Sequence, residues 1–257
     1  MQDRPLAGRA ALVTGVSRRR GIGFATAQRL ALLGADLMLQ ALTTYDAQQA
    51  WGADQEGMVP LLAELRSHGT RVEYVEADFL EPQAPQRVME AAQAAFGNID
   101  ILIANHAYST DGALEDLAAE SIDTHLLVNV RASLLLVKEF AAQYRGQSGG
   151  RVILLTSGQA LGPMPGELAY VASKGALHQL TQSLSAHLIP RGITVNAINP
   201  GPTDTGWADG ALYEHIKEAF PQGRWGEPED AARLIAWLCT DDARWITGQI
   251  INSTGGF

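Results

Sequence analysis

Short apolar runs alternate with amphipathic segments along almost the whole chain. The runs are rich in Val, Ile and Leu and lie at residues 10–14, 36–41, 71–77, 99–104, 151–157, 193–198 and 247–252. Most of the segments between them place apolar residues at helical spacing, at 24–34, 59–69, 117–144, 169–188 and 229–239. Strands that alternate with helices predict a parallel sheet covered on both faces, joined by right-handed crossovers. The fold class is therefore α/β and doubly wound.

The totals limit the domain organisation and the partners. With 257 residues, 46% of them hydrophobic, the chain can form one large α/β domain or two small ones. Neither a composition break nor a low-complexity linker divides it, so we expect a single domain over 1–257. The formal net charge of -9 argues against a general affinity for nucleic acid or anionic membranes.

The cysteine count and the apolar stretches bear on location. Cys239 is the only cysteine, which excludes an internal disulfide and a cysteine-built metal site, and we expect it to be a small buried residue. The start of the chain has no apolar signal core, and the most apolar stretch, 30–42, is interrupted by Gly34 and Asp36. We therefore expect a soluble cytoplasmic protein with no membrane segment and no bound metal.

A glycine-rich turn follows the first predicted strand. Thr14 ends that strand, and Gly15, Gly21 and Gly23 lead into a helix that opens near Ile22. Glycines let the backbone approach a pyrophosphate, while a helix N-terminus offers unpaired N–H groups and positive potential. The segment is therefore a candidate dinucleotide site, with a plain turn as the alternative. The candidate contacts in it are Gly15, Ser17, Arg18, Arg19, Gly21, Ile22 and Gly23.

Three consecutive arginines in this turn bear on the choice of cofactor. Guanidinium groups recognise a ribose 2′-phosphate well, so Arg18 or Arg19, helped by the Thr43 hydroxyl, could contact it; a solvated basic loop is the alternative. The second strand ends at Ala41 and is followed by residues 42–44, without the acid that would bind the hydroxyls of an NAD ribose. We expect NADP(H) rather than NAD(H). Residues 43–57 are polar, show no clear period, and form an insertion of unknown role.

Ser157, Tyr170 and Lys174 are the candidate chemical groups. Tyr170 and Lys174 are four residues apart in a predicted helix, so their side chains share one face. A nearby ammonium favours the phenolate and is expected to lower the pKa of Tyr170 toward the range of a useful acid or base. Ser157 ends an apolar strand, and the loop after it is long enough to bring the hydroxyl beside the phenol. A lone Tyr-x-x-x-Lys could also be a solvated helix pair.

This arrangement, with the Thr14–Gly15 turn and Asn199-Pro200-Gly201, resembles the short-chain dehydrogenase/reductase family from about residue 8 to residue 256. The resemblance implies a single Rossmann-type domain with about seven strands in the order 3-2-1-4-5-6-7, and hydride transfer between a nicotinamide cofactor and a small carbonyl or alcohol. It also implies a homotetramer. Two additional residues between Gly15 and Gly21 depart from the family pattern.

The resemblance assigns further roles residue by residue. Asn129, in the apolar helix at 117–144, would be the fourth catalytic residue, with a satisfied core amide as the alternative. Asp78 would meet the adenine edge, or else cap a helix. Asn105, at the end of its strand, would lie beside the cofactor ribose. The neighbouring His106 either contacts the cofactor or is merely tolerated at this position. Pro200, Gly201 and Thr203 would hold the nicotinamide carboxamide, and Tyr170 and Lys174 would also contact the cofactor.

The substrate is less well defined. Residues 203–226 carry several aromatics among glycines and charges, and predict a mobile lid, although packing alone could explain the aromatics. The pocket is expected to be bordered by Gln159, Met164, Glu167 and Trp207. By analogy a 3-oxoacyl thioester is the first candidate substrate, although the acidic surface offers no docking patch for an acidic carrier. A non-catalytic NADP-binding sensor is the main alternative, and a sugar-nucleotide epimerase would need a further domain.

Overall fold

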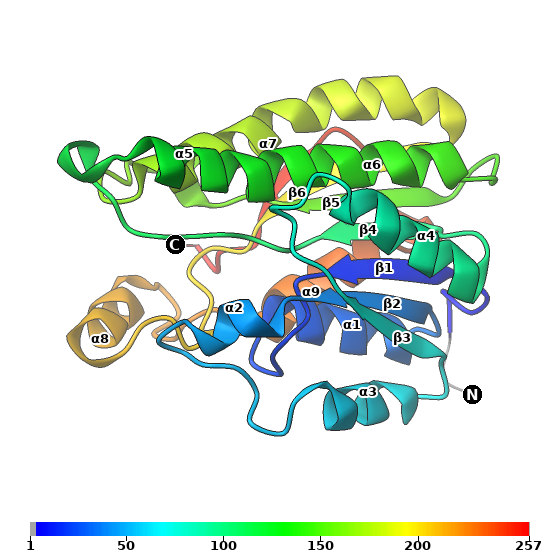
Figure 1. Cartoon of the computed structure of the whole chain (residues 1–257), viewed down its shortest axis with the longest axis horizontal. Coiled ribbons are helices and arrows are strands. Elements are labelled where there is room, and N and C mark those ends of the chain that lie inside the picture. Colours follow the sequence, from blue (N-terminus) through cyan, green and yellow to red (C-terminus); the bar gives the residue numbers. More distant parts are fainter. Residues whose placement is uncertain (1–3, 257) are drawn as a thin grey trace.

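The computed structural model describes residues 4–256, and its centre is a sheet of seven parallel strands (Figure 1). The strand order is β3-β2-β1-β4-β5-β6-β7, which confirms the predicted doubly wound α/β topology. The strands are β1 (Ala10–Thr14), β2 (Asp36–Ala41), β3 (Val72–Glu76), β4 (Ile101–Ala104), β5 (Gly150–Leu155), β6 (Ile193–Asn199) and β7 (Ile250–Asn252). Residues of β1, β4, β5 and β6 are buried throughout, as expected of central parallel strands that read as continuous apolar runs.

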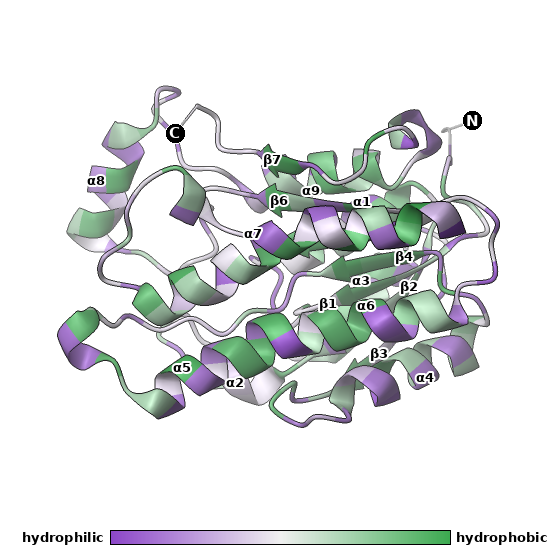
Figure 2. Ribbon diagram, turned by 90° about the horizontal axis from the view of Figure 1, so that it is seen from above, coloured by the Kyte–Doolittle hydropathy of each residue, from purple (hydrophilic) through white to green (hydrophobic). Residues whose placement is uncertain are grey.

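Helices cover both faces of this sheet. They are α1 (Ile22–Leu32), α2 (Thr43–Ala47), α3 (Met58–Arg66), α4 (Ala84–Phe96), α5 (Ala119–His125), α6 (Ala132–Gln143), α7 (Leu168–Leu188), α8 (Gly210–Ala219) and α9 (Pro228–Leu238). One apolar core joins the sheet to α1, α3 and α9, and the second joins it to α4, α6 and α7. Figure 2 shows α6 and α7 running side by side across the sheet. The sheet is therefore packed on both faces.

The register brings the carboxyl ends of the central strands to one edge. Val13 of β1 lies beside Ile103 of β4, and Ala104 lies beside Leu154 of β5. The short helices α2 and α8 project from this same end of the molecule (Figure 1). Ligands bind at the carboxyl edge of open α/β sheets, so this is the edge to search for the site.

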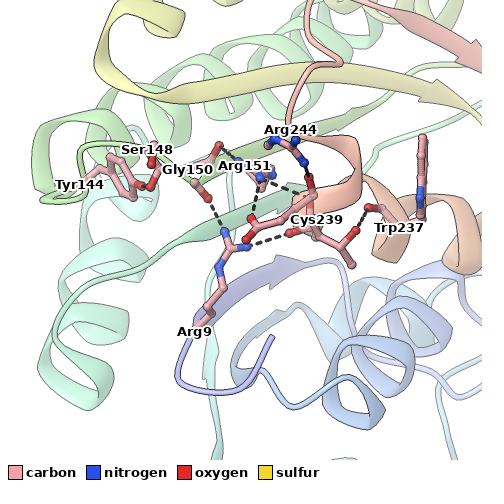
Figure 3. A network of polar contacts seen from close by, with 11 residues as sticks. Arg9, Tyr144, Ser148, Gly150, Arg151, Trp237, Cys239 and Arg244 are labelled. Atoms are coloured by element: carbon pink, nitrogen blue, oxygen red, sulfur yellow. Dashed lines mark hydrogen bonds and ion pairs between the residues drawn. The ribbon is translucent and has the colours of Figure 1, made fainter. Parts of the chain in front are cut away.

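The opposite, amino edge of the sheet is fastened by two arginines (Figure 3). Arg9 donates to the backbone carbonyls of Cys239 and Gly149. Arg151, which is 2% exposed, donates to the Thr240 carbonyl and pairs with Asp241. Because carbonyls at a helix C-terminus carry partial negative charge, the cations favour this position. We name this group the arginine clamp: Arg9, Arg151 and the carbonyls that they bind.

Three local features refine the predictions from sequence. The polar insertion at 43–57 contains a short helix, α2, that the lack of a period concealed. The long helix expected over 117–144 is divided into α5 and α6 by a π-helical turn at Leu126–Arg131. Cys239 is buried as expected, and burial raises the pKa of its thiol to about 12. Among residues 4–256, no helix combines the length and the apolar character that a membrane crossing requires.

Candidate active site

Ser157, Tyr170 and Lys174 meet at the carboxyl end of β5. Ser157 follows the strand, Tyr170 and Lys174 lie on successive turns of α7, and a side-chain hydrogen bond joins Ser157 to the phenol. The ammonium of Lys174 is 2% exposed and lies 5.6 Å from the centroid of the Tyr170 ring. It donates a hydrogen bond of 2.8 Å to the Leu155 carbonyl. The structure thus brings the three predicted groups together, as their spacing indicated.

Burial governs the ionisation of these groups. It raises the pKa of Tyr170 to about 12, and the hydrogen bond with Ser157 opposes that rise. Burial also lowers the pKa of Lys174 to about 8. The expectation that the pKa of Tyr170 is lowered toward neutrality is therefore wrong, because loss of solvation dominates. The phenol stays protonated at neutral pH, which is the form that a proton donor requires.

Asn129 lies in the π-helical turn and is fully buried. Its side-chain oxygen accepts from the backbone N–H of Tyr108 at 2.7 Å, and its amide nitrogen donates to the Tyr108 carbonyl and the Ser173 hydroxyl, each at 2.9 Å. The amide therefore joins the loop after β4 to the helix that carries Tyr170. Single π-helical turns are frequently found at functional sites. Asn129 is therefore the satisfied core amide of the alternative interpretation, and the same hydrogen bonds connect the segments that form the site.

The glycine turn is built for close backbone approach. Gly15 has φ +70°, and a Cβ there would lie 2.8 Å from the His106 Cα. A Cβ at Gly23 would lie 2.4 Å from the Gly15 carbonyl oxygen and 2.7 Å from the amide of Asn105. Gly21 precedes α1, whose first residue is Ile22. Only glycine at positions 15 and 23 lets the turn pack this closely on itself and on the end of β4. We call this turn the cradle, and its position before the N-terminus of α1 fits the pyrophosphate role predicted for it.

A cavity of about 360 Å³ opens beside this cradle. It is lined by the glycine turn, by the ends of β2, β3 and β4, and by α2. Asp78 lines it, and a carboxylate oxygen of Asp78 accepts from the Leu80 N–H at 2.8 Å, so the residue stabilises a turn. The alternative that Asp78 caps the next helix is wrong, because Gln83 is the N-cap of α4.

The arginines of the turn are already paired with acids. Arg18 Nε lies 3.1 Å from an Asp46 carboxylate oxygen, and its guanidinium lies over the Trp51 ring. Arg19 pairs with Asp54, Glu56 and Glu64. Thr43 donates to Glu76 at 2.9 Å. Among the described residues, the lining of the cavity includes none of Arg18, Arg19 and Thr43. Arg18 is linked to the cavity through Asp46, so a contact of these residues with a 2′-phosphate stays a prediction.

Asp46 is a site residue that sequence reasoning missed. It is 7% exposed, lines the cavity, and accepts hydrogen bonds from the Ser17 hydroxyl and the Trp51 indole. Residues 42–44, directly after β2, carry no acid, but Asp46 in α2 brings a carboxylate into the lining of the same cavity. Its position in a polar insertion without a clear period gave no indication that it would line a cavity. Its charge is balanced by Arg18.

The remaining predicted contacts lie at the ends of β4 and β6. The amide of Asn105 donates to the carbonyls of Thr14 and Gly15, so the residue shapes the glycine turn. Gly201 has φ +66° and follows Pro200 in the turn after β6. The Thr203 hydroxyl lies 3.3 Å from the carbonyls of Pro200 and Gly201. All of these residues lie around the strand ends, as predicted.

Comparison with known proteins shows the family to which this chain belongs. A family model described as enoyl-(acyl carrier protein) reductase matches residues 15–257. A solved short-chain dehydrogenase/reductase from Serratia marcescens is 34% identical and superimposes with a TM-score of 0.88, covering 98% of this chain and 99% of that one. The chain belongs to the short-chain dehydrogenase/reductase family. It is therefore an oxidoreductase of the kind that uses a nicotinamide cofactor.

Other members of the short-chain dehydrogenase/reductase family are equally extensive matches. An uncharacterized oxidoreductase of Bacillus subtilis is 42% identical over 96% of each chain. An NADPH-dependent aldehyde reductase-like protein of Arabidopsis thaliana is 37% identical, over 98% of this chain and 95% of its own. A short-chain dehydrogenase from Burkholderia cenocepacia, solved in complex with NADP, is 36% identical with a TM-score of 0.88, covering 98% of both chains.

The segment predicted as a lid contains α8 and a cluster of aromatic rings. Trp225 is 4% exposed and lies within 4.8 Å of the Tyr213 ring and 5.4 Å of the Trp207 ring, measured between centroids. Phe220 packs beside it. These aromatics contact one another, so packing within the segment explains most of them, while Trp207 remains 43% exposed. The lid role of residues 203–226 in this short-chain dehydrogenase/reductase stays a prediction.

Proposed function

We propose that the protein is an NADP-preferring reductase of small ketones or aldehydes that also oxidises the corresponding alcohols, with Tyr170 as the general acid or base. The observation that carries this proposal is the placement of a buried Tyr170 phenol, protonated at neutral pH, beside the Ser157 side chain and with the buried ammonium of Lys174 5.6 Å from the centroid of its ring. A non-catalytic sensor would have no use for a proton donor held in this way.

Each of these groups has a defined task in the reductive direction. A bound nicotinamide nucleotide supplies the hydride to the carbonyl carbon. Tyr170 gives its phenolic proton to the carbonyl oxygen, so that the alcohol forms, and Ser157 donates to the same oxygen. The positive charge of Lys174 favours the phenolate that Tyr170 leaves behind. The backbone at Gly15, Gly21 and Gly23 and the N-terminus of α1 would hold the pyrophosphate.

The substitution Tyr170→Phe tests this proposal. It removes the proton donor but keeps the ring, so we expect turnover to fall at least ~100-fold while NADPH binding is retained. Turnover is followed as NADPH oxidation with a panel of aldehydes, ketones and a 3-oxoacyl thioester, and binding by calorimetry. Tyr74→Phe, on the half-exposed face of β3, is the matched control and should match the wild type. Near-normal turnover in Tyr170→Phe would remove the phenol from the mechanism.

The preference for NADP is proposed on the position of Arg18. Its guanidinium pairs with Asp46, which lines the cavity, and donates to the Thr205 carbonyl, so this arginine balances the charge of Asp46. Two relatives of this fold, from Burkholderia cenocepacia and a metagenomic library, were solved with NADP and NADPH. An unpaired Asp46 would favour the free ribose hydroxyls of NAD instead.

The substitution Arg18→Met tests the cofactor preference. We expect NADPH to bind roughly tenfold or more weakly, because one charge-assisted contact to the phosphate is lost, while NADH should bind at least as tightly as in the wild type, because Asp46 loses its partner. Dissociation constants for both nucleotides are measured by calorimetry, with Arg29→Met on the exposed side of α1 as the control. Equal weakening for the two nucleotides, or equal affinities in the wild type, would contradict the preference.

The substrate follows from chemistry only as far as its class. The family description supports an acyl thioester, and the Arabidopsis relative's name supports an aldehyde, so both belong in the panel. NADPH oxidation by the protein with any substrate of the panel would show that it is a reductase and not a non-catalytic sensor. Assembly as a homotetramer and a cytoplasmic location stay predictions, the first of which light scattering would test.

A further inference from the structure

His106 connects the end of β1 to the π-helical turn. It follows Asn105 at the end of β4 and is 7% exposed. Its Nδ1 lies 2.7 Å from the Thr14 hydroxyl, and its Nε2 lies 3.1 Å from the Val128 carbonyl oxygen. The Phe79 ring packs against the imidazole, with 4.3 Å between the centroids. These contacts fix the ring on three sides, so it has one orientation.

The partners also fix where the proton lies. A carbonyl oxygen can only accept, so the Nε2 that faces Val128 carries the hydrogen. Burial lowers the pKa of His106 to about 3, so the ring is neutral and its Nδ1 has a free lone pair. Thr14 accepts from the backbone N–H groups of Asn105 and His106. Its own hydroxyl lies 2.7 Å from Nδ1 and 3.2 Å from the Ile103 carbonyl oxygen, and the shorter contact favours donation to Nδ1. The imidazole is therefore a fixed donor at one nitrogen and does not exchange protons between about pH 5 and 9.

The carbonyl that His106 binds belongs to the residue before Asn129. A π-helical turn departs from the regular hydrogen-bond ladder of the flanking helices, so additional donors stabilise it. The structure supplies two from side chains: His106 donates to Val128, and the Ser133 hydroxyl donates to the Asn129 carbonyl at 2.7 Å. The Asn129 amide can reach Tyr108 and Ser173 only while this turn keeps its shape.

We propose that His106 is a positioning residue: its Nε2–H holds the Val128 carbonyl, which fixes the π-helical turn and so directs Asn129 at the Tyr108 backbone and at α7. The role in turnover rests on the proposed reductase function, whereas the role in holding the turn does not. His106 touches neither Tyr170 nor Lys174 in any described hydrogen bond, and acts through Asn129.

Two variants separate the contacts of the ring. The side-chain nitrogen of glutamine in His106→Gln reaches as far as Nε2 and keeps a donor for Val128. The side chain of His106→Asn reaches only as far as Nδ1, so it can contact Thr14 but loses Val128. The variants differ by one methylene, both are polar and neutral, and circular dichroism and thermal unfolding establish that each is folded. Any difference between them in the π-helical turn reports the Val128 contact.

The first measurement is amide hydrogen exchange without added nucleotide. We expect peptides covering 126–131 and 107–110 to exchange at the wild-type rate in His106→Gln, and roughly tenfold faster in His106→Asn, the factor that one net hydrogen bond provides. Equal exchange in the two variants would overturn the positioning role. This measurement needs no substrate, so it decides the inference even if no carbonyl compound is reduced, an outcome that would instead refute the proposed function.

The second measurement is steady-state turnover with NADPH. We expect kcat to fall roughly tenfold in His106→Asn and to be rescued in His106→Gln, with the dissociation constant of NADPH within about twofold of wild type in both. The pH profile of kcat should keep its shape in both variants, since the imidazole does not titrate. A limb lost from the profile of His106→Gln would show that the ring transfers protons, and would overturn the proposal.

Discussion

Replacing Lys174 by methionine should stabilise the nucleotide-free protein at neutral pH and not at high pH. The Lys174 side chain is 2% exposed and has one described hydrogen bond, to the Leu155 carbonyl. Burial lowers the pKa of its ammonium from 10.5 to about 8. Methionine has a similar length and no charge, so the substitution removes a buried cation while largely filling its space. The Leu155 carbonyl loses one donor, which costs about 1 kcal/mol at every pH.

The magnitude follows from proton linkage. Between about pH 8 and 10.5 the unfolded chain keeps the proton of Lys174 that the folded chain has released, so the free energy of unfolding of the wild type rises with pH across this window. The fall in pKa from 10.5 to about 8, at ~1.36 kcal/mol per pH unit, amounts to about 3 kcal/mol. Below pH 8 this destabilisation is complete and constant. After the lost hydrogen bond is subtracted, Lys174→Met should gain about 2 kcal/mol at pH 7.

Urea unfolding followed by tryptophan fluorescence measures this difference from pH 7 to 10.5. In the upper part of this range the unfolded chain also loses protons from Tyr170 and Cys239, whose pKa values burial raises to about 12 in the folded protein. Both groups are present in both proteins, so the difference between the two curves isolates Lys174. Lys138→Met, at a largely exposed position on α6, is the matched control. A difference between wild type and Lys174→Met that stays flat over the window would refute the reasoning.

Two further predictions concern the reaction and the glycine turn. Carbonyl reduction should decline as pH rises through about 8, because Lys174 then loses the charge that favours the phenolate; Lys174→Arg should move this decline to higher pH, and an unmoved pH profile of kcat would contradict that cause. Gly23→Ala should abolish measurable NADPH binding by calorimetry, because its Cβ would lie 2.4 Å from the Gly15 oxygen. Gly162→Ala, where a Cβ has open space, should bind as the wild type does, and equal binding by both variants would contradict the cradle.

The parts of this protein that sequence predicted are those in which local pattern and burial agree. Each central strand is buried on both faces and therefore reads as an uninterrupted apolar run, as in β5 and β6. Glycines are needed wherever backbone approaches backbone, which made the turn at Gly15 and Gly23 visible. The helical spacing of Tyr170 and Lys174 was sufficient to bring them together on α7.

The parts that sequence did not predict depend on contacts between distant segments. Asp46 lines the cavity because α2 lies beside it. A five-residue helix in a polar insertion has no apolar stripe from which the helix could be predicted. The π-helical turn depends on donors that include His106, from the loop after β4. The pKa of Tyr170 depends on how deeply the phenol is buried and on where the Lys174 ammonium points, and neither is encoded in a four-residue spacing.

The arginine clamp constrains the amino rim of the sheet, where the strands begin, more than the carboxyl rim, where they end. On the amino rim, Arg9 and Arg151 bind the start of β5 to the end of α9 through backbone carbonyls. Rotation of the layers about that fastened rim moves atoms in proportion to their distance from it. The travel is greatest at the far rim, where α2 and α8 project, so we predict that these two short helices, rather than the body of the sheet, move when a dinucleotide enters or leaves.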